Sequence, residues 1–371
     1  MTDRPTVAII NIENLKYNYA RLKELLGEGT TVMSVIKADA YGHGVTRVAG
    51  ALEESGCRSF GVALASEGVA LREAGIKGEI VVLTGIYPGD VDRVFDFNLT
   101  PVVFDTNVAR LINERAESLG VKKLVHVKID TGMGRLGVKT SNVTEFFTEI
   151  KNFSRLEIEG VMSHFADAEA EDKAFSKTQL DAFKKALVEL EALGINPHVR
   201  HIANSAAIID IPEAHLDMVR AGLMLYGVYP LEILRSKIDL KPVMELKSAV
   251  THIKKLSVGD SVGYGRTFTA ERESKVGIVP IGYADGYLRS LSNCGEMLVG
   301  GERVKVVGVV SMDTTVVDLT GISDVSAGDE VMIIGRQGSG EITAAEVAEK
   351  AGTISYEILC RLGSRVPKIY V

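Results

Sequence analysis

The sequence predicts an α/β fold in two parts: an N-terminal (β/α)8 barrel of the TIM type and a C-terminal, mostly antiparallel β domain. Three observations predict it. Eight short apolar runs occur between residues 31 and 220, amphipathic stretches separate several of them, and the pattern changes after residue 238. We therefore expect the barrel over residues 1–238 and the β domain over residues 239–371, with residues 1–10 as candidates to pair with the β domain.

The eight apolar runs are rich in β-branched residues and are too short for helices, which is typical of buried strands. Amphipathic stretches over 14–26, 106–119 and 176–193 have helical spacing. Strands that alternate with helices pair in parallel, and eight of them fit a closed barrel. The predicted strands are 31–36, 60–64, 80–83, 101–104, 124–129, 156–163, 198–202 and 217–220.

A doubly wound open sheet is the competing architecture. Its dinucleotide fingerprint would place three spaced glycines after the first strand. Gly42 and Gly44 are the nearest match there, and the third glycine is missing. The barrel is therefore favoured.

The pattern after residue 238 is that of a β domain. Helical periodicity nearly vanishes until residues 343–351. Apolar runs over 276–281, 304–310 and 330–335 alternate with glycine-rich turns, which indicates antiparallel strands.

Composition excludes several classes of protein. The chain has 42 Lys and Arg against 49 Asp and Glu, a net charge of −7, and no basic cluster, so no nucleic-acid partner is expected. No apolar run is long enough for a membrane span, and residues 1–11 do not have the pattern of a signal peptide. Three distant cysteines predict no disulfide framework and a cytoplasmic location. No Cys or His spacing predicts a metal site.

Polar residues follow the predicted strands at the end where a barrel enzyme builds its site. Lys37 directly follows the first strand. Partial desolvation there would favour the uncharged amine that a Schiff base needs. The alternative is a lysine that extends to the barrel rim.

Later strands add groups that can bind anions. Arg135 follows two glycines after the fifth strand and can bind a carboxylate in a fork. His164 follows the sixth strand. Asn204 and Ser205 follow the seventh, where they could seat a phosphate or simply cap a helix. Arg220 ends the eighth strand and needs a partner. A lysine, a phosphate seat, a histidine and two arginines suit pyridoxal phosphate.

The chain resembles the bacterial alanine racemase family over essentially its whole length. The barrel motifs that carry the resemblance are Val-Ile-Lys-Ala-Asp-Ala-Tyr-Gly-His-Gly at 35–44, Lys-Ile-Asp-Thr-Gly-Met-Gly-Arg at 128–135, Met-Ser-His-Phe-Ala at 162–166 and Asn-Ser at 204–205. The β domain adds Val-Gly-Tyr-Gly at 262–265, Gly-Tyr-Ala-Asp-Gly at 282–286, Ser-Met-Asp at 311–313 and Ile-Ser-Tyr-Glu at 354–357.

This resemblance implies a homodimeric, pyridoxal-phosphate-dependent racemase that interconverts L- and D-alanine and supplies D-alanine for peptidoglycan. Lys37 would bind the cofactor and act as the acid/base on the D side. Tyr264, from the partner subunit, would act on the L side. Arg220 would lie beside the pyridine nitrogen, and His164 near the ring.

The resemblance also implies binding residues. Arg135 and the Met312 backbone would contact the substrate carboxylate. Lys128 corresponds to a lysine that is carbamylated in many members of the family. The other implied cofactor contacts, mostly to the phosphate, are Tyr41, Asn204, Ser205, Gly222, Leu223 and Tyr356.

The sequence departs from the family pattern at two positions. Ser311 stands where many members have cysteine, and Val309 where several have an arginine that lines the substrate corridor. Because of the departure at Val309, the resemblance does not predict how the substrate reaches the site. It still predicts the chemistry.

Three alternative functions stay open at this point: a racemase of serine or of a longer amino acid, a related decarboxylase, and a non-catalytic carrier of the cofactor. Decarboxylases of this architecture favour an acidic partner for the pyridine nitrogen, so Arg220 speaks against them. The β domain with Tyr264 and Met312 speaks against a carrier.

Overall fold

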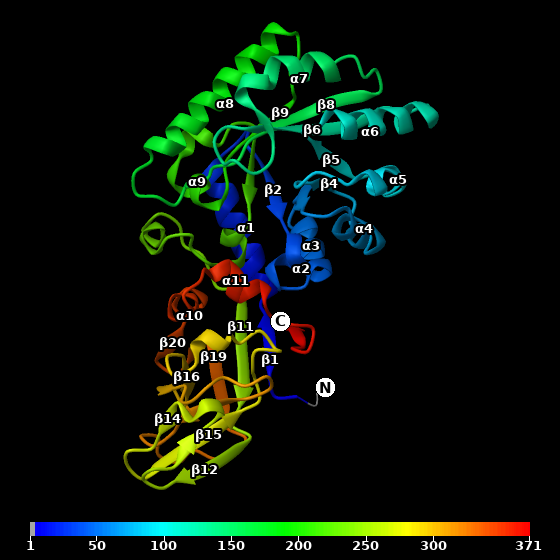
Figure 1. Ribbon diagram of the computed structural model, residues 1–371. Coiled ribbons are helices and arrows are strands. Elements are labelled where there is room, and N and C mark those ends of the chain that lie inside the picture. The colour runs from blue at the N-terminus through cyan, green and yellow to red at the C-terminus, as the bar shows by residue number, and fades with distance from the viewer. Residues whose placement is uncertain (1–3) are drawn as a thin grey trace. The chain divides into compact units, whose positions relative to one another are not determined.

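The computed structural model describes residues 4–371, which form two compact units. One unit comprises Leu15–Ala40 and Val45–Leu240, and we call it the barrel unit. The other comprises the described residues 4–14 together with Tyr41–Gly44 and Lys241–Val371, and we call it the β unit. The predicted fold class, a parallel barrel followed by an antiparallel β domain, is confirmed (Figure 1).

Eight parallel strands form a nearly closed barrel in the order β10-β2-β3-β4-β5-β6-β8-β9, with the short β7 (Val138–Lys139) paired to β6. Two backbone hydrogen bonds join the segments that contain β9 and β10: Asp217 N, just before β10, donates to Arg200 O at 3.2 Å, and Arg220 N donates to Ala203 O, just after β9, at 3.0 Å. The strands are β2 (Thr31–Val35), β3 (Ser59–Val62), β4 (Glu79–Val82), β5 (Thr100–Val103), β6 (Lys123–Asp130), β8 (Leu156–Met162), β9 (Val199–His201) and β10 (Met218–Ala221).

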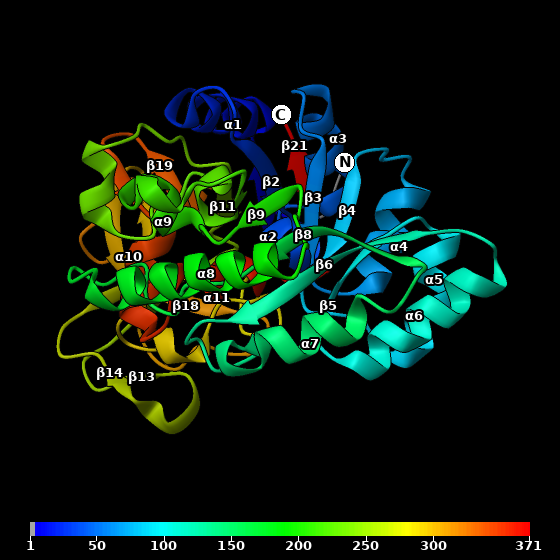
Figure 2. The same ribbon diagram turned by 90° about the horizontal axis from the view of Figure 1, so that it is seen from above.

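Helices lie outside the strands of the barrel unit, as the two views show (Figures 1 and 2). Asp105 caps α6 by accepting a hydrogen bond from Val108 N at 3.0 Å. That helix buries Ala109, Ile112 and Ala116, which lie on one face at helical spacing. The helices are α1 (Ile12–Leu26), α2 (Lys37–Tyr41), α3 (Val45–Glu54), α4 (Ala65–Glu73), α5 (Val91–Asp96), α6 (Thr106–Ser118), α7 (Val143–Ile150), α8 (Ala174–Ala192) and α9 (Ser205–Asp210).

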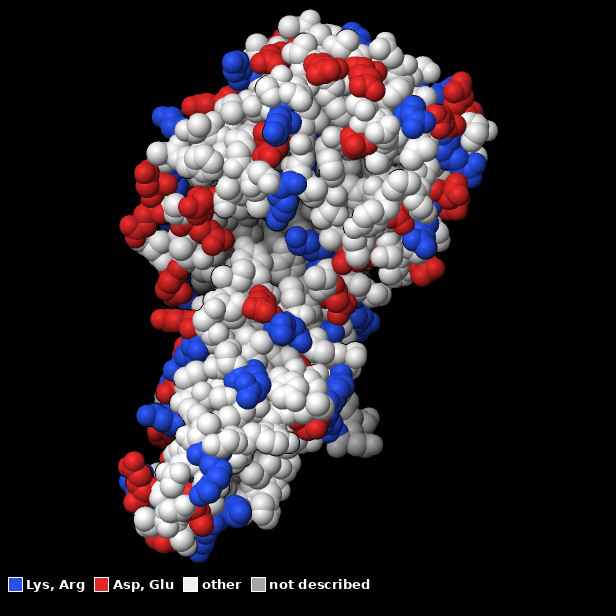
Figure 3. All heavy atoms as spheres, in the orientation of Figure 1, with Lys and Arg blue, Asp and Glu red and all other residues white. Residues whose placement is uncertain are grey.

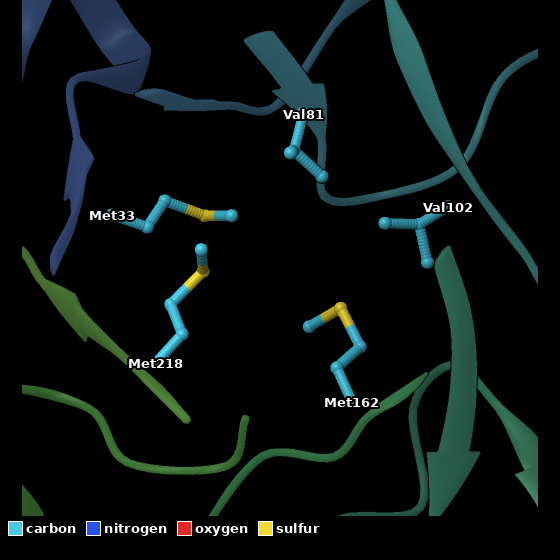
Figure 4. Close-up of a cluster of buried hydrophobic side chains, with 5 residues drawn as sticks. All are labelled: Met33, Val81, Val102, Met162 and Met218. Atoms are coloured by element: carbon cyan, nitrogen blue, oxygen red, sulfur yellow. The ribbon is translucent and has the colours of Figure 1, made fainter. Parts of the chain in front are cut away.

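A cluster of apolar side chains fills the inside of the barrel (Figure 4). Met33, Met162 and Met218 meet Val81 and Val102, and each of the five is at most 5% exposed. Methionine is unbranched, so three of them can fill the irregular space that a ring of tilted strands leaves. This packing makes the barrel interior a core rather than a pore.

The β unit is built from three sheets. The largest has the order β17-β16-β19-β11-β1-β21, with β20 on β19. The others are β12-β15-β18 and β13-β14. The strands are β11 (Met244–Ala249), β12 (His252–Leu256), β13 (Ser261–Val262), β14 (Phe268–Thr269), β15 (Ser274–Val279), β16 (Glu296–Val299), β17 (Glu302–Lys305), β18 (Thr315–Asp318), β19 (Glu330–Gln337), β20 (Gly340–Ile342) and β21 (Lys368–Tyr370).

The start of the chain belongs to this unit. Strand β1 (Val7–Ile10) pairs antiparallel with β11 and parallel with β21. Residues 1–3 of the predicted pairing segment lie outside the described residues.

Two local predictions in the β unit differ from the structure. The run 304–310 is not one strand, because β17 ends at Lys305 and Gly308 has φ +78°. A Cβ at Gly308 would lie 2.8 Å from Val262 O, so the chain turns tightly there. Besides α10 (Ala344–Ala351), the unit has a second helix, α11 (Ser355–Cys360), which is too short to show helical periodicity in the sequence.

No helix among residues 4–371 is long and apolar enough to cross a membrane. On the face shown in Figure 3, basic and acidic side chains are interspersed over both units rather than gathered by sign.

The methionine cluster should contribute measurably to stability. We expect Met33→Ala to lower the free energy of unfolding by about 2–5 kcal/mol, because it leaves a cavity that rigid strands cannot close. The near-isosteric Met33→Leu should cost less than about 1.5 kcal/mol. Urea unfolding followed by circular dichroism measures both. Equal losses for the two variants would show that the packing at Met33 does not matter.

Candidate active site

The barrel unit carries its candidate site residues at the C-terminal ends of five strands, where barrel enzymes place their chemistry. Lys37 follows β2, Lys128 lies near the end of β6, and Arg135 lies in the loop beyond β6. His164 follows β8. The remaining candidates, Asn204, Ser205, Arg220, Gly222 and Leu223, lie at the ends of β9 and β10 or directly after them.

An unusual backbone turn follows Lys37. Although α2 has helical hydrogen bonding, Ala38, Asp39 and Ala40 have φ/ψ near +53°/+50°, and Tyr41 has φ +52°. Left-handed conformation costs about 1–2 kcal/mol for each residue other than glycine. Such strain persists at functional sites when the surroundings hold it in place.

Several hydrogen bonds hold this left-handed turn. Ala40 N donates to Ile36 O at 2.9 Å, and Val45 N donates to the Asp39 carboxylate at 2.8 Å. Ala38 N donates to the Glu67 carboxylate at 2.7 Å. No motif in the sequence points to Glu67. Its only signal was an acidic residue in the first turn of α4, where its other oxygen accepts from Ala63 N and Leu64 N.

Arg220 is 4% exposed and has no carboxylate among its hydrogen-bond partners. Its Nη2 lies 2.7 Å from Ser163 O, 2.9 Å from Ile202 O and 3.0 Å from His164 Nδ1, so its two hydrogens are shared among these three acceptors. Its Nη1 donates to His201 Nδ1 at 3.0 Å. Burial lowers the pKa of Arg220 to about 9, which still leaves the guanidinium charged at neutral pH.

Arg220 determines the state of His164. Because a guanidinium can only donate, His164 Nδ1 must accept and its proton must lie on Nε2. Burial, and then Arg220, lower the pKa of His164 well below its usual value. His164 is therefore a neutral imidazole that offers an Nε2–H donor.

Positive charge accumulates around Lys128. Burial lowers its pKa to about 8, with further lowering by Arg220, Arg135 and Lys37. Asp130 opposes this, but its carboxylate already accepts hydrogen bonds from the backbone N–H groups of residues 132 and 134. These bonds shape the loop that carries Arg135, which is exposed. This end of the barrel is therefore suited to an anionic ligand.

The ends of β9 and β10 are joined through Ser205. Its Oγ accepts from Gly222 N at 3.0 Å and from Met224 N at 3.4 Å. Asn204 caps α9 by accepting from Ala207 N at 3.1 Å. Capping was the alternative reading of Asn204, and Asn204 does perform it.

The other candidates belong to the β unit. The rings of Tyr41 and Tyr356 have centroids 5.9 Å apart, and burial raises the pKa of Tyr41. Tyr264 and Met312 are exposed, at 73% and 51%. Roles for these four residues stay predictions.

Comparison with known proteins identifies the family. The family profile described as "Alanine racemase, N-terminal domain" matches residues 10–230, and the one described as "Alanine racemase, C-terminal domain" matches residues 243–370. The chain belongs to the alanine racemase family. The resemblance found in the motifs is thereby confirmed.

Individual alanine racemases match over their full length. One from Halothermothrix orenii is 45% identical over 367 residues, which is 99% of this chain and 97% of the relative. One from Carboxydothermus hydrogenoformans is 43% identical, with 99% and 100% coverage. The predicted enzyme class, an amino-acid isomerase, is confirmed by these matches.

Solved alanine racemase structures have the same fold. The one from Clostridium difficile superposes with a TM-score of 0.93 at 38% identity, covering 100% of this chain and 97% of that chain. The one from Bacillus anthracis, described with bound L-Ala-P, has a TM-score of 0.94 at 33% identity, with 100% and 96% coverage.

Two buried polar residues near the site also escaped sequence analysis. Gln179 on α8 is fully buried. Its amide donates to His164 O at 3.1 Å and accepts from Ala166 N at 2.9 Å, so it holds the loop that carries His164. His126 on β6 is fully buried, and its Nδ1 lies 2.9 Å from His201 Nε2. Neither lies in a motif that suggested a site.

Buried neutral histidines should make stability depend on pH. Burial, and then Arg220, lower the folded-state pKa of His126 to about 4, below the unfolded value of about 6.5. The folded state then binds fewer protons than the unfolded state between these pH values. The contribution of His126 to the free energy of unfolding is therefore complete above pH 6.5 and is lost as the pH falls toward 4. We expect His126→Asn to reduce the pH dependence of unfolding by about 1.4 kcal/mol per pH unit in that range.

Denaturant midpoints at pH 7, 6 and 5 measure this slope. Exposed His198 offers a matched control for the exchange of a histidine for an asparagine, as His198→Asn. Parallel curves for the wild type and His126→Asn would contradict the prediction.

Proposed function

We propose that this chain uses pyridoxal phosphate to interconvert L- and D-alanine by a two-base mechanism, with Lys37 and the partner subunit's Tyr264 on opposite faces of Cα. The observation that carries the proposal is the concentration of cationic and donor groups around Arg220 and Lys128, directly beside the lysine that follows β2. The family match supports the same reading.

The residues of the barrel unit fit this cofactor. Among the cations near Lys128, Arg135 suits the carboxylate of an amino acid. Arg220 suits the pyridine nitrogen, because one Nη1 hydrogen and the Nε hydrogen have no acceptor among residues 4–371. When bound, pyridoxal phosphate supplies the electron sink that makes the Cα proton of an amino acid acidic.

Each residue then has a defined task. Lys37 binds the cofactor and exchanges a proton with one face of Cα, and Tyr264 serves the other. Two bases are needed because racemisation removes a proton from one face and delivers one to the opposite face. Arg135 and the Met312 backbone bind the carboxylate of the substrate. The cofactor is also bound by His164 at its ring and by Tyr41, Asn204, Ser205, Gly222, Leu223 and Tyr356, mostly at its phosphate.

Arg220 shapes the outcome of the reaction. It would donate a hydrogen bond to the pyridine nitrogen without handing over its proton, because it stays charged at neutral pH. Arg220 would therefore leave the cofactor a weaker electron sink than a carboxylic acid at the same place would. A weaker sink disfavours side reactions such as transamination.

Lys128 is a candidate for carbamylation. With its pKa lowered to about 8, a usable fraction of the amine is neutral at pH 7–8. The nitrogen lone pair attacks carbon dioxide, an N–C bond forms and a proton is released. The resulting anion would offset the charge of Arg135.

Alanine is the substrate we favour over serine or a longer amino acid. The curated relatives are named alanine racemases, and the Bacillus anthracis structure holds L-Ala-P. A homodimer in the cytoplasm that supplies D-alanine for peptidoglycan completes the proposal.

The first test is direct. Purified protein with pyridoxal phosphate should show a visible absorbance band and convert L-alanine to D-alanine, with L-serine and L-lysine turned over far more slowly. Chiral chromatography measures the products. Absence of the band after soaking with cofactor would overturn the proposal, and faster turnover of serine or lysine would replace alanine as substrate.

Complementation tests the shared site. Lys37→Ala and Tyr264→Ala should each be inactive as homodimers, since each lacks one base at both sites. After subunit exchange, heterodimers have one intact site, so an equimolar mixture should recover about a quarter of wild-type activity. Native mass spectrometry confirms the exchange, and exchange without recovery would exclude a base from the partner.

A further inference from the structure

Arg220 has a second histidine partner that the proposed reaction does not use. His201 is fully buried on β9, and its Nδ1 accepts from Arg220 Nη1 at 3.0 Å. His201 Nε2 lies 2.9 Å from His126 Nδ1. The two imidazole rings meet edge to face, with centroids 5.0 Å apart. A chain of three side chains therefore leads from the site into the barrel.

The donor-only chemistry of Arg220 fixes every proton in this chain. Since His201 Nδ1 must accept, its proton lies on Nε2. His126 Nδ1 must then accept from His201, so the proton of His126 lies on its own Nε2. Burial, followed by Arg220, lowers the pKa of both histidines. Each ring is thus neutral and has a single compatible tautomer.

The far end of the chain points to a carboxylate. His126 Nε2 lies 3.7 Å from Glu79 Oε1, and it has no hydrogen-bond partner among residues 4–371. Glu79 begins β4, so it lies at the end of the barrel opposite the site. Burial raises its pKa, while Ser59 Oγ donates to its other oxygen at 3.1 Å. The carboxylate attracts the Nε2–H of His126 and so favours the same tautomer.

The barrel is built to admit His126. The pairing of β6 with β8 shifts between Val125 and His126, so that His126 lies opposite Gly160 and Glu159 has no partner residue. A Cβ at Gly160 would lie 2.6 Å from both Cε1 and Nδ1 of the His126 ring. The bulge and the glycine together make room for the ring against β8.

We propose that His201 and His126 are positioning residues for Arg220, forming a relay that holds its guanidinium as a charged donor directed at the cofactor ring. The proposal rests on the proposed function. Without His126, His201 can adopt the tautomer with its proton on Nδ1. Its Nδ1–H then faces the Nη1–H of Arg220, and repulsion between these two donors displaces the guanidinium. At metal sites, removing a residue that orients a ligand typically lowers activity by about 10–100-fold. We expect loss of the relay to lower kcat by an amount at the lower end of that range.

The proton positions can be measured without catalysis. Two-dimensional ¹H–¹⁵N spectra of the full chain labelled with ¹⁵N-histidine, with and without pyridoxal phosphate, distinguish the two neutral tautomers and the imidazolium. We expect His201 and His126 both to be neutral, with the proton on Nε2, from pH 6 to pH 8. A proton on Nδ1 of His201 in the wild type would overturn the relay. Because this result does not depend on racemase activity, it stands or fails separately from the proposed function.

Matched substitutions test whether the relay matters for turnover. His126→Asn keeps an acceptor near the position of Nδ1, whereas His126→Leu removes it. Gly160→Ala displaces the ring without changing its chemistry. We expect His126→Leu and Gly160→Ala to lower kcat about tenfold and to shift the visible absorbance band, with KM for alanine within about twofold of wild type. His126→Asn should keep most of kcat, and Met33→Leu in the methionine cluster controls for general changes inside the barrel.

The outcomes separate positioning from plain packing. Equal kcat for His126→Asn and His126→Leu would overturn the proposal, as would an unchanged absorbance band in both His126→Leu and Gly160→Ala. If His126→Leu fails to fold, Gly160→Ala and the wild-type spectra still test whether His201 and His126 position Arg220. A wild type that shows the expected tautomers but does not racemise alanine would refute the proposed function and leave the proton assignments in place.

Discussion

A buried guanidinium without a carboxylate partner is the constraint on which the rest of the site depends. Burying a charge is costly unless hydrogen bonds replace its water. Arg220 meets this requirement with two backbone carbonyls and two imidazole nitrogens, and with no counter-charge. Because Arg220 can only donate, the Nδ1 atoms of His164 and His201 must accept, so Arg220 determines the tautomer of both histidines.

The same charge acts on the neighbouring groups. It lowers the pKa of Lys128 and of His164, after burial as the larger cause. Around Lys128, the cations Arg220, Arg135 and Lys37 are opposed by Asp130, whose carboxylate is engaged with backbone N–H groups. Such an excess of positive charge is unfavourable on its own. Binding of the anionic substrate proposed above would relieve it.

Much of the fold could be predicted because its signals are local. The eight barrel strands were found within a few residues of their observed bounds, since each is a short apolar run between polar turns. The short helix α11 and the early end of β17 could not be predicted. The first is too brief to show a period, and the second depends on Gly308 packing against Val262. The candidate residues Lys37, His164 and Arg220 were found because they directly follow apolar strands or end them.

The sequence by itself determined the fold class, the family and the residue types available to the site, because apolar periodicity and motif order are properties of the chain. The tertiary structure alone decided which polar groups meet. His126 and His201 are 75 residues apart, and Glu67 and Gln179 lie on helices outside the motifs. The roles of His126 and His201 arise only when closure of the barrel brings β6, β9 and β10 together around Arg220. No local pattern encodes those contacts, since the energy that places a neutral histidine against Arg220 comes from burial and from a donor–acceptor match across strands.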